Sequence, residues 1–125
     1  MEVKFLRCPK CGNIVAVVKE SGVKIQCCGS AMEEIIPGTV EASKEKHIPV
    51  YLVNGNEVTI RVGSVDHPMQ DVHYIEWVML QTKFGNQRRM LKPNDAPEVK
   101  FALLDNDEVV AVYAYCNLHG LWKAN

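Results

Sequence analysis

The residues best suited to metal chemistry near the C-terminus are a cysteine and a histidine three positions apart, Cys116 and His119. Apolar residues alternate along a predicted strand over Val110–Cys116, so the Cys116 thiol should point inward and be buried where a sheet ends. In a continuing strand His119 would face away from Cys116. A turn that begins at Asn117 and ends at Gly120 would bring the two side chains to one point. The spacing therefore predicts a chelating pair.

The three other histidines come earlier in the chain, and each is predicted at a strand end or in a loop. His47 stands at the entrance to a predicted strand, and Pro68 disfavours helix at His67. If the residues from His67 to His73 were extended, these two side chains would lie ~20 Å apart. A shared metal therefore requires the segment to curl back, and Gln70-Asp71 can supply the turn. With the C-terminal pair, the histidines offer up to five ligands on one rim of a β domain.

Five donors limit the choice of metal for this second site. Zinc is usually satisfied by four ligands, whereas iron commonly takes six, so four neutral imidazoles and one thiolate would leave one iron position free for a small ligand. Copper is the rival, because a cysteine, a loop and a histidine on a β-sandwich also describe cupredoxins, which use two histidines, a cysteine and a weak axial ligand. Here two histidines would be left over, and no Met follows His119. The donor set favours iron.

A second group of metal-ligating residues lies in the first 28 positions, where four of the five cysteines are found. Cys8 and Cys11 form a CxxC knuckle, and Cys27-Cys28 form an adjacent pair. An odd cysteine total in a chain with no export signal suits metal binding better than disulfides. A structural zinc ribbon, a four-thiolate iron site and two disulfides all remain open on these residues alone. The sulfurs of Cys27 and Cys28 should leave the chain in near-opposite directions, because the two residues are adjacent. Binding both sulfurs to one ion should strain its tetrahedral coordination.

Residues 1–36 are predicted to form a small metal-stabilised module, because so short a segment cannot bury enough apolar area alone. Two short strands are predicted over 13–18 and 23–26, with a hairpin at Gly22. Residues 37–40 are predicted to be a linker, since Pro37 and Gly38 end the first pattern.

Residues 41–125 are predicted to be an all-β domain of six or seven short strands, which indicates a β-sandwich. The hairpin signal Asn54-Gly55 separates strands over 49–53 and 57–62. A strand over 74–82 should place Ile75, Trp77 and Met79 on one face, and a Gly85-Asn86 turn should lead to a strand over 87–91. Strands over 99–104 and 108–116 are predicted to pair with each other, and residues 41–46 to form a brief helical turn.

Composition and charge restrict the partners. The 125 residues are 47% hydrophobic and 23% charged, which is typical of a soluble globular protein. A formal net charge of -1 gives no footprint for nucleic acid or membrane binding. The segment Met1–Arg7 has no apolar signal core, and no apolar run approaches the ~20 residues that span a bilayer. The cytoplasm is the expected location.

Over nearly its whole length the chain resembles desulfoferrodoxin, the two-iron form of superoxide reductase. The residues that carry the resemblance are Cys8-x-x-Cys11, Cys27-Cys28, Glu45-Lys46-His47-Ile48-Pro49-Val50, His67-Pro68-Met69, His73-Tyr74-Ile75-x-Trp77 and Cys116-Asn117-Leu118-His119-Gly120-x-Trp122. The resemblance implies a desulforedoxin-like domain over 1–36, in which Cys8, Cys11, Cys27 and Cys28 hold one iron. It also implies an immunoglobulin-like domain over 41–125, in which a second iron is bound by His47, His67, His73 and His119 in a square, with Cys116 as the axial thiolate.

The implied activity is one-electron reduction of superoxide to hydrogen peroxide by ferrous iron, in a homodimer that receives electrons from a rubredoxin-like donor. Lys46 would attract the anion and orient a protonating water, and Glu45 would bind the ferric iron after turnover. Backbone N–H groups near Leu118 and His119 are expected to tune the sulfur. Two other functions are also compatible with these residues. One is a non-enzymatic electron carrier, and the other is a zinc-ribbon interaction module fused to a β-sandwich.

Overall fold

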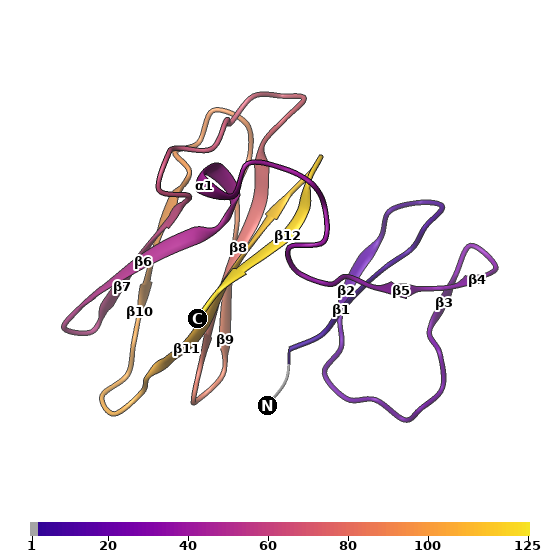
Figure 1. The fold of residues 1–125 in the computed structure, drawn as a ribbon. Coiled ribbons are helices and arrows are strands. Elements are labelled where there is room, and N and C mark those ends of the chain that lie inside the picture. Colours follow the sequence, from indigo (N-terminus) through magenta and orange to yellow (C-terminus); the bar gives the residue numbers. More distant parts are fainter. Residues whose placement is uncertain (1–2) are drawn as a thin grey trace. The chain divides into compact units, whose positions relative to one another are not determined.

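The structure is a computed structural model that describes residues 3–125. The chain separates into two compact units, of which the first ends at Ile36 and the second runs from Pro37 to Asn125 (Figure 1). Over the described residues, no helix has the length and apolar character needed to span a membrane. The Gly38 N–H donates to the Leu121 carbonyl oxygen at 2.8 Å, so the segment that follows Ile36 is attached to the second unit.

The N-terminal unit contains five short strands: β1 (Phe5–Arg7), β2 (Ile14–Ala16), β3 (Gln26–Cys27), β4 (Ser30–Ala31) and β5 (Glu33–Glu34). β1 lies between β2 and β5 in a three-stranded sheet, and β3 pairs with β4. The predicted hairpin around Gly22 was wrong, because the strands on its two sides pair elsewhere. Val18 and Val23 are 93% and 80% exposed, so a hairpin there would bury little apolar surface.

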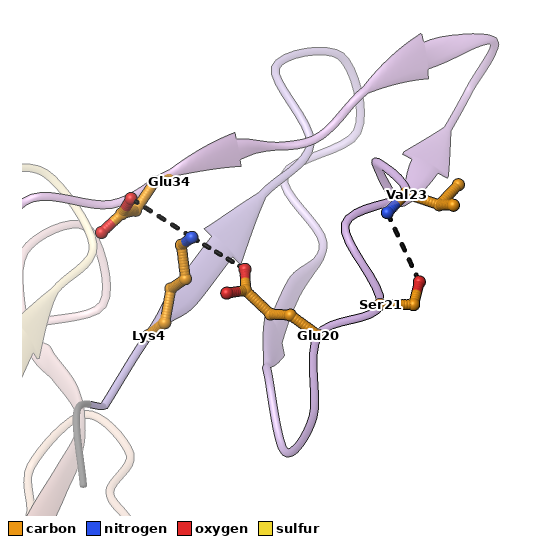
Figure 2. A network of polar contacts seen from close by, with 5 residues as sticks. All are labelled: Lys4, Glu20, Ser21, Val23 and Glu34. Carbon is orange, nitrogen blue, oxygen red and sulfur yellow. Dashed lines mark hydrogen bonds and ion pairs between the residues drawn. The ribbon is translucent and has the colours of Figure 1, made fainter.

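Exposed ion pairs attach the loop after β2 to the sheet of this unit. The Lys4 ammonium lies 2.8 Å from Glu20 and 3.7 Å from Glu34, and the Val23 N–H donates to the Ser21 hydroxyl at 3.4 Å (Figure 2). Pairs of this kind contribute only about 0–1 kcal/mol each. Among residues 3–36 the buried apolar side chains are Phe5, Cys8 and Met32. The unit therefore lacks a hydrophobic core of ordinary size.

The C-terminal unit is a β-sandwich with one short helix. Its elements are α1 (Lys44–His47), β6 (Pro49–Asn54), β7 (Glu57–Val62), β8 (Ile75–Thr82), β9 (Asn86–Met90), β10 (Glu98–Ala102), β11 (Val109–Cys116) and β12 (Gly120–Ala124). One sheet has the order β10-β7-β6 and the other β12-β11-β8-β9. The core between them consists of Val58, Ile60, Val62, Ile75, Val78, Leu80, Val99, Phe101, Leu103, Val112, Ala114 and Cys116. The predicted all-β fold class is confirmed.

The pairing predicted between residues 99–104 and 108–116 was wrong. β10 pairs with β7, whereas β11 pairs with β8 and β12, so the connection crosses from one sheet to the other. Val99 and Phe101 are buried on the inner face of the three-stranded sheet. Turn-forming residues such as Asn106, whose φ is +68°, serve a connection between sheets as well as a hairpin. Turn chemistry alone therefore did not identify the partner strand.

The predicted face of β8 was also wrong at one end. The register shifts between the pairs Tyr115–Trp77 and Cys116–Ile75, which places one extra residue, Glu76, in β8. A bulge of this kind reverses the alternation of side chains. Ile75 consequently packs in the core beside Val78 and Leu80 rather than sharing a face with Trp77. A similar irregularity near Val109 leaves Val110 45% exposed, although the later alternate residues of β11 are buried as predicted.

Antiparallel pairing collects several strand ends at one end of the sandwich. Pro49, at the start of β6, pairs with Val62, at the end of β7. Cys116, at the end of β11, pairs with Ile75, at the start of β8, and with Gly120, at the start of β12. The α1 helix, the β7–β8 connection and the β11–β12 turn all join these ends. Residues separated widely in sequence can therefore meet there.

Candidate metal centres

The four N-terminal cysteines form one donor group. The sulfur atoms of Cys8, Cys11, Cys27 and Cys28 all lie within 4.8 Å of one another. The Cys11 and Cys27 sulfurs are 3.6 Å apart, those of Cys27 and Cys28 are 3.9 Å apart, and all are free thiols rather than disulfides. Cys28 has a φ of +53°, a left-handed conformation that is uncommon for a residue with a side chain. Local backbone strain thus turns the adjacent pair toward one point.

The electrostatics of this group suit a bound cation. Backbone N–H groups of Cys11 and Lys10 both lie 3.4 Å from the Cys8 sulfur, and they lower the pKa of Cys8 to about 6. The hydrogen bond that Cys28 makes with the Cys11 side chain raises the pKa of Cys28 to about 12. One thiolate is therefore favoured, and further ionisation is opposed unless the sulfurs share a positive charge. Four convergent thiols fit either four-coordinate zinc or a four-thiolate iron.

The second donor group lies at the end of the sandwich described above. His47 ends α1, His67 and His73 lie in the β7–β8 connection, Cys116 ends β11, and His119 lies in the turn before β12. The ligand atoms of the first three histidines and Cys116 all lie within 4.8 Å of one another. His119 joins them through Nδ1, which is 3.1 Å from His47 Nε2 and 3.8 Å from the Cys116 sulfur. The predicted return of the His67–His73 segment is confirmed by the bridge between Gln70 and His73.

The four imidazoles form a closed square. Each ring is edge-on to the next, with interplanar angles of 79°, 83°, 76° and 90° around the order His47, His67, His73, His119. Neighbouring centroids are 4.5 to 5.0 Å apart, whereas the opposite pair, His47 and His73, is 6.2 Å apart. Such an arrangement turns nitrogen atoms toward a common centre instead of stacking ring faces.

Hydrogen bonds to the outer nitrogens of two rings show that a cation fits this centre. His47 Nδ1 lies 2.6 Å from the Ser43 carbonyl oxygen, and His67 Nδ1 lies 2.7 Å from that of Pro68. A carbonyl oxygen only accepts, so each Nδ1 carries the hydrogen and each neutral ring presents a lone pair at Nε2. Those two Nε2 atoms are 3.0 Å apart. Facing lone pairs repel unless a cation lies between them, and His73 Nε2 is also buried without a hydrogen-bond partner in the described chain.

Burial prepares these ligands for metal binding. It lowers the pKa of His67 to about 4 and also lowers the pKa values of His47 and His73, so the neutral form of these three rings is favoured. Cys116 is fully buried as expected, and burial raises the pKa of its thiol. The backbone N–H groups of Leu118 and His119 oppose that increase, because they donate to the sulfur and stabilise the thiolate. The predicted contribution of these two N–H groups is therefore present.

The turn that carries His47 also presents the two charged residues singled out from the sequence. Glu45 is exposed and Lys46 is half-buried, both within α1. The Lys46 charge contributes to the lowered pKa values of His47 and His73, which places its positive field at the centre. The Glu45 carbonyl oxygen accepts from the Val65 N–H at 3.0 Å. This backbone contact attaches α1 to the residues that follow β7.

Gly63 is a residue of this site that sequence reasoning missed. It has a φ of +83°, and a Cβ there would lie 2.6 Å from the Lys46 carbonyl carbon and also against the Glu45 carbonyl oxygen. The α1 turn can therefore approach β7 this closely only because position 63 has no side chain. A glycine that ends a strand before Ser64 is a turn signal, but the sequence does not reveal which segment lies against it.

Replacing Gly63 by alanine should displace α1 and weaken the second centre. A non-glycine residue at positive φ costs about 1–2 kcal/mol by itself, and the contact with Lys46 adds to this cost. Gly55→Ala is the matched control, because Gly55 has a φ of +61° with no atom within 4 Å of an added Cβ. Urea unfolding and metal analysis should show a larger loss of stability and a lower metal content only for G63A. Equal behaviour of the two variants would contradict the close-approach argument.

Trp122 forms part of the wall of the second centre. Its ring centroid lies 5.1 Å from that of His47, and its indole N–H donates to the His119 carbonyl oxygen at 3.0 Å. One buried side chain thus contacts two of the imidazole-bearing residues. This contact follows from the turn between β11 and β12, which was predicted from Asn117 and Gly120 and is present, whereas the strand β12 that follows it was not predicted.

Fold and donor sets together define an all-β protein with one four-thiol centre and one centre of four imidazoles and a thiol. The family model for desulfoferrodoxin matches residues 39–125. Desulfoferrodoxin of Nitratidesulfovibrio vulgaris is 44% identical, with 98% of this chain and 96% of that protein covered. The desulfoferrodoxin homolog of Archaeoglobus fulgidus is 42% identical over similar shares, 98% and 96%. The chain belongs to the desulfoferrodoxin family.

Solved structures agree with this assignment. The crystal structure of the superoxide reductase from Treponema pallidum has a TM-score of 0.83 and 39% identity, and it covers 99% of this chain and 98% of its own. The superoxide reductase (1Fe-SOR) from Giardia intestinalis has a TM-score of 0.55 and 37% identity, with 65% of this chain and 96% of its own covered. The resemblance stated from the motifs is confirmed, and the two donor groups confirm the expected pair of metal centres.

Proposed function

We propose that this chain is a superoxide reductase, which converts superoxide to hydrogen peroxide at the centre formed by His47, His67, His73, His119 and Cys116. The observation that carries the proposal is the square of four imidazoles with a buried thiol beside it. Five convergent donors exceed what zinc usually takes, and they suit iron. Superoxide reductases are also among the solved structures most like this chain.

When bound, ferrous iron supplies one electron to superoxide, which takes up two protons and leaves as hydrogen peroxide. The chain's own residues prepare the site for this reaction. Burial lowers the pKa values of His47, His67 and His73, which favours their neutral rings, and the N–H groups of Leu118 and His119 favour the thiolate of Cys116. Lys46 adds a positive field that attracts the anion and orients a protonating water. Glu45 supplies an exposed carboxylate on the same turn that can bind the oxidised centre.

Replacing Lys46 by alanine should slow the reaction with superoxide by about 10-fold at low ionic strength, because local positive fields raise association rates by 10-fold or more. The dependence of the rate on salt should also become shallower. Pulse radiolysis measures both quantities. Lys44→Ala is the matched control, since it removes the same charge from the same helical turn. An unchanged rate and salt dependence in K46A would remove Lys46 from the mechanism.

The N-terminal unit is proposed to hold the other iron through Cys8, Cys11, Cys27 and Cys28. Residues 1–36 then form a desulforedoxin-like domain, residues 37–40 a linker and residues 41–125 the superoxide reductase domain. A homodimer in the cytoplasm, reduced by a rubredoxin-like donor, completes the proposal and would protect the cell against oxidative stress. Four cysteines that converge as one donor group suit a metal site in a reducing compartment. The exposed apolar side chains of Val50, Leu52 and Val53 on edge strand β6 support self-association.

Stoichiometry separates this enzyme from an electron carrier. The iron-loaded protein is reduced, exposed to a known amount of superoxide and analysed for reoxidation of the second centre and for peroxide. One peroxide per superoxide consumed, without release of dioxygen, is expected. Slow reoxidation without stoichiometric peroxide would favour the carrier, and a colourless protein that contains only zinc would favour a structural module. Optical and EPR spectra of the oxidised protein identify the metal directly.

A further inference from the structure

The backbone pairing between β8 and β11 ends at Ile75 and Cys116. Beyond this pair, the next residue, Asn117, makes further hydrogen bonds to the segment before β8. The Asn117 N–H donates to the Tyr74 carbonyl oxygen at 3.1 Å. Its side-chain oxygen accepts from the Tyr74 N–H at 2.9 Å, and its side-chain nitrogen donates to the Val72 carbonyl oxygen at 3.1 Å. Asn117 therefore makes three hydrogen bonds to the two residues that flank His73 in the chain.

The position of His73 is fixed through hydrogen bonds of the main chain around it. His47 and His67 each donate from Nδ1 to a carbonyl oxygen, which sets the ring directly. His73 Nε2 is buried and has no hydrogen-bond partner in residues 3–125. The backbone of His73 is instead held on one side by Gln70, at 2.9 and 3.0 Å, and its two neighbours are held by Asn117. Hydrogen bonds thus hold the main chain on both sides of this ring.

We infer that Asn117 is a positioning residue, which fixes His73 relative to Cys116 and His119. The inference rests on the proposed second iron centre, because its consequence is a correctly spaced ligand set. A planar amide is needed, since it offers a donor and an acceptor side by side. Aspartate would keep the acceptor for Tyr74 but lose the donor, and alanine would lose both. Asn117 lies next to a ligand in sequence and acts on another ligand across the β8–β11 boundary.

Iron retention in the full-length, iron-loaded protein tests the inference. Asn117→Ala should release iron from the second centre to a strong chelator about 10–100-fold faster, the usual cost of removing support for a ligand. The four-cysteine centre in the same molecule is the internal reference, and its visible spectrum should not change. Asn56→Ala is the control, because Asn56 makes an exposed side-chain hydrogen bond to Asp105 at 2.9 Å elsewhere in the unit. An iron-release rate from N117A equal to that of the wild type would overturn the inference.

Hydrogen exchange provides a readout that does not depend on activity. A peptide covering residues 72–75 should lose protection at the Tyr74 N–H in N117A and keep it in Asn117→Asp, whose carboxylate still accepts that hydrogen bond. Protection retained in N117A, or lost throughout β8 and β11 in both variants, would overturn the positioning role. If the wild-type second centre proves to hold no iron, the proposed function fails, whereas the exchange result still decides whether Asn117 holds the His73 segment.

Discussion

Cys116→Ser should slow the reduction of superoxide at least about 100-fold while the protein stays folded. Cys116 is the sulfur donor of the second centre, it is fully buried, and two backbone N–H groups donate to it. A serine hydroxyl at this position is a much weaker ligand, because it does not ionise at physiological pH. Removing a residue that hydrogen-bonds to a metal ligand already lowers metal affinity or activity about 10–100-fold. Removing the ligand itself should therefore lower the rate with superoxide at least about 100-fold.

The measurement combines pulse radiolysis with optical spectra of the oxidised protein. Thiolate-to-iron absorption from the second centre should disappear in C116S, whereas absorption from the four-cysteine centre should remain. Ala114→Ser is the matched control, since Ala114 is a buried residue on the same face of β11 and its substitution also buries a hydroxyl. A C116S protein that keeps full iron and reacts within 10-fold of the wild type would contradict the assigned role of the thiolate.

The ligands could be predicted from the sequence because their residue types are unusual and their neighbours carry backbone signals. Asn117 and Gly120 indicate a turn that brings His119 back toward Cys116. Gln70-Asp71 indicates a second turn, which brings His73 back toward His67. Both turns are present. Turn-forming residues close to a metal-ligating residue in the sequence restrict the positions that its side chain can reach. Local information was therefore enough to bring His73 toward His67 and His119 toward Cys116.

Partnerships between distant segments could not be predicted in the same way. β10 was assigned to the wrong neighbour, because the loop before β11 has the same turn chemistry whether the chain stays in one sheet or crosses to the other. The bulge at Glu76 depends on which residues of β11 lie opposite. Nothing local marks either feature, since both are decided by burial of apolar faces across the sandwich.

Supporting contacts made by the main chain also have no signature in the sequence. The carbonyl oxygens that receive hydrogen bonds from His47 and His67 belong to Ser43 and Pro68, and any residue type offers such an oxygen. Gly63 is detectable as a glycine, but its requirement comes from the approach of Lys46. The sequence therefore predicts which metal-ligating side chains converge, and it predicts poorly the contacts that orient them.

Loss of metal from the four-cysteine centre should unfold the N-terminal unit and leave the β-sandwich folded. Over residues 3–36 the buried apolar side chains are only Phe5, Cys8 and Met32, and units shorter than about 40 residues usually need metals or disulfides. Metal binding in small cysteine sites contributes about 10–16 kcal/mol of apparent free energy, which exceeds any plausible deficit here. The sandwich has its own core between two sheets and does not depend on these sulfurs.

Cys8→Ser tests this dependence, because Cys8 is the fully buried member of the group and its thiolate is the most favoured. Hydrogen exchange at the N–H groups of Val17 and Ile35, which donate to Lys4 and Phe5, should become fast, whereas protection in β8 and β11 should persist. Lys4→Ala is the control, since removal of exposed ion pairs should cost less than about 1 kcal/mol. Protected N-terminal amides in C8S would mean that the short strands are stable without metal. If C8S still reduces superoxide while its N-terminal unit is unfolded, the four-cysteine iron has a structural role and takes no part in turnover.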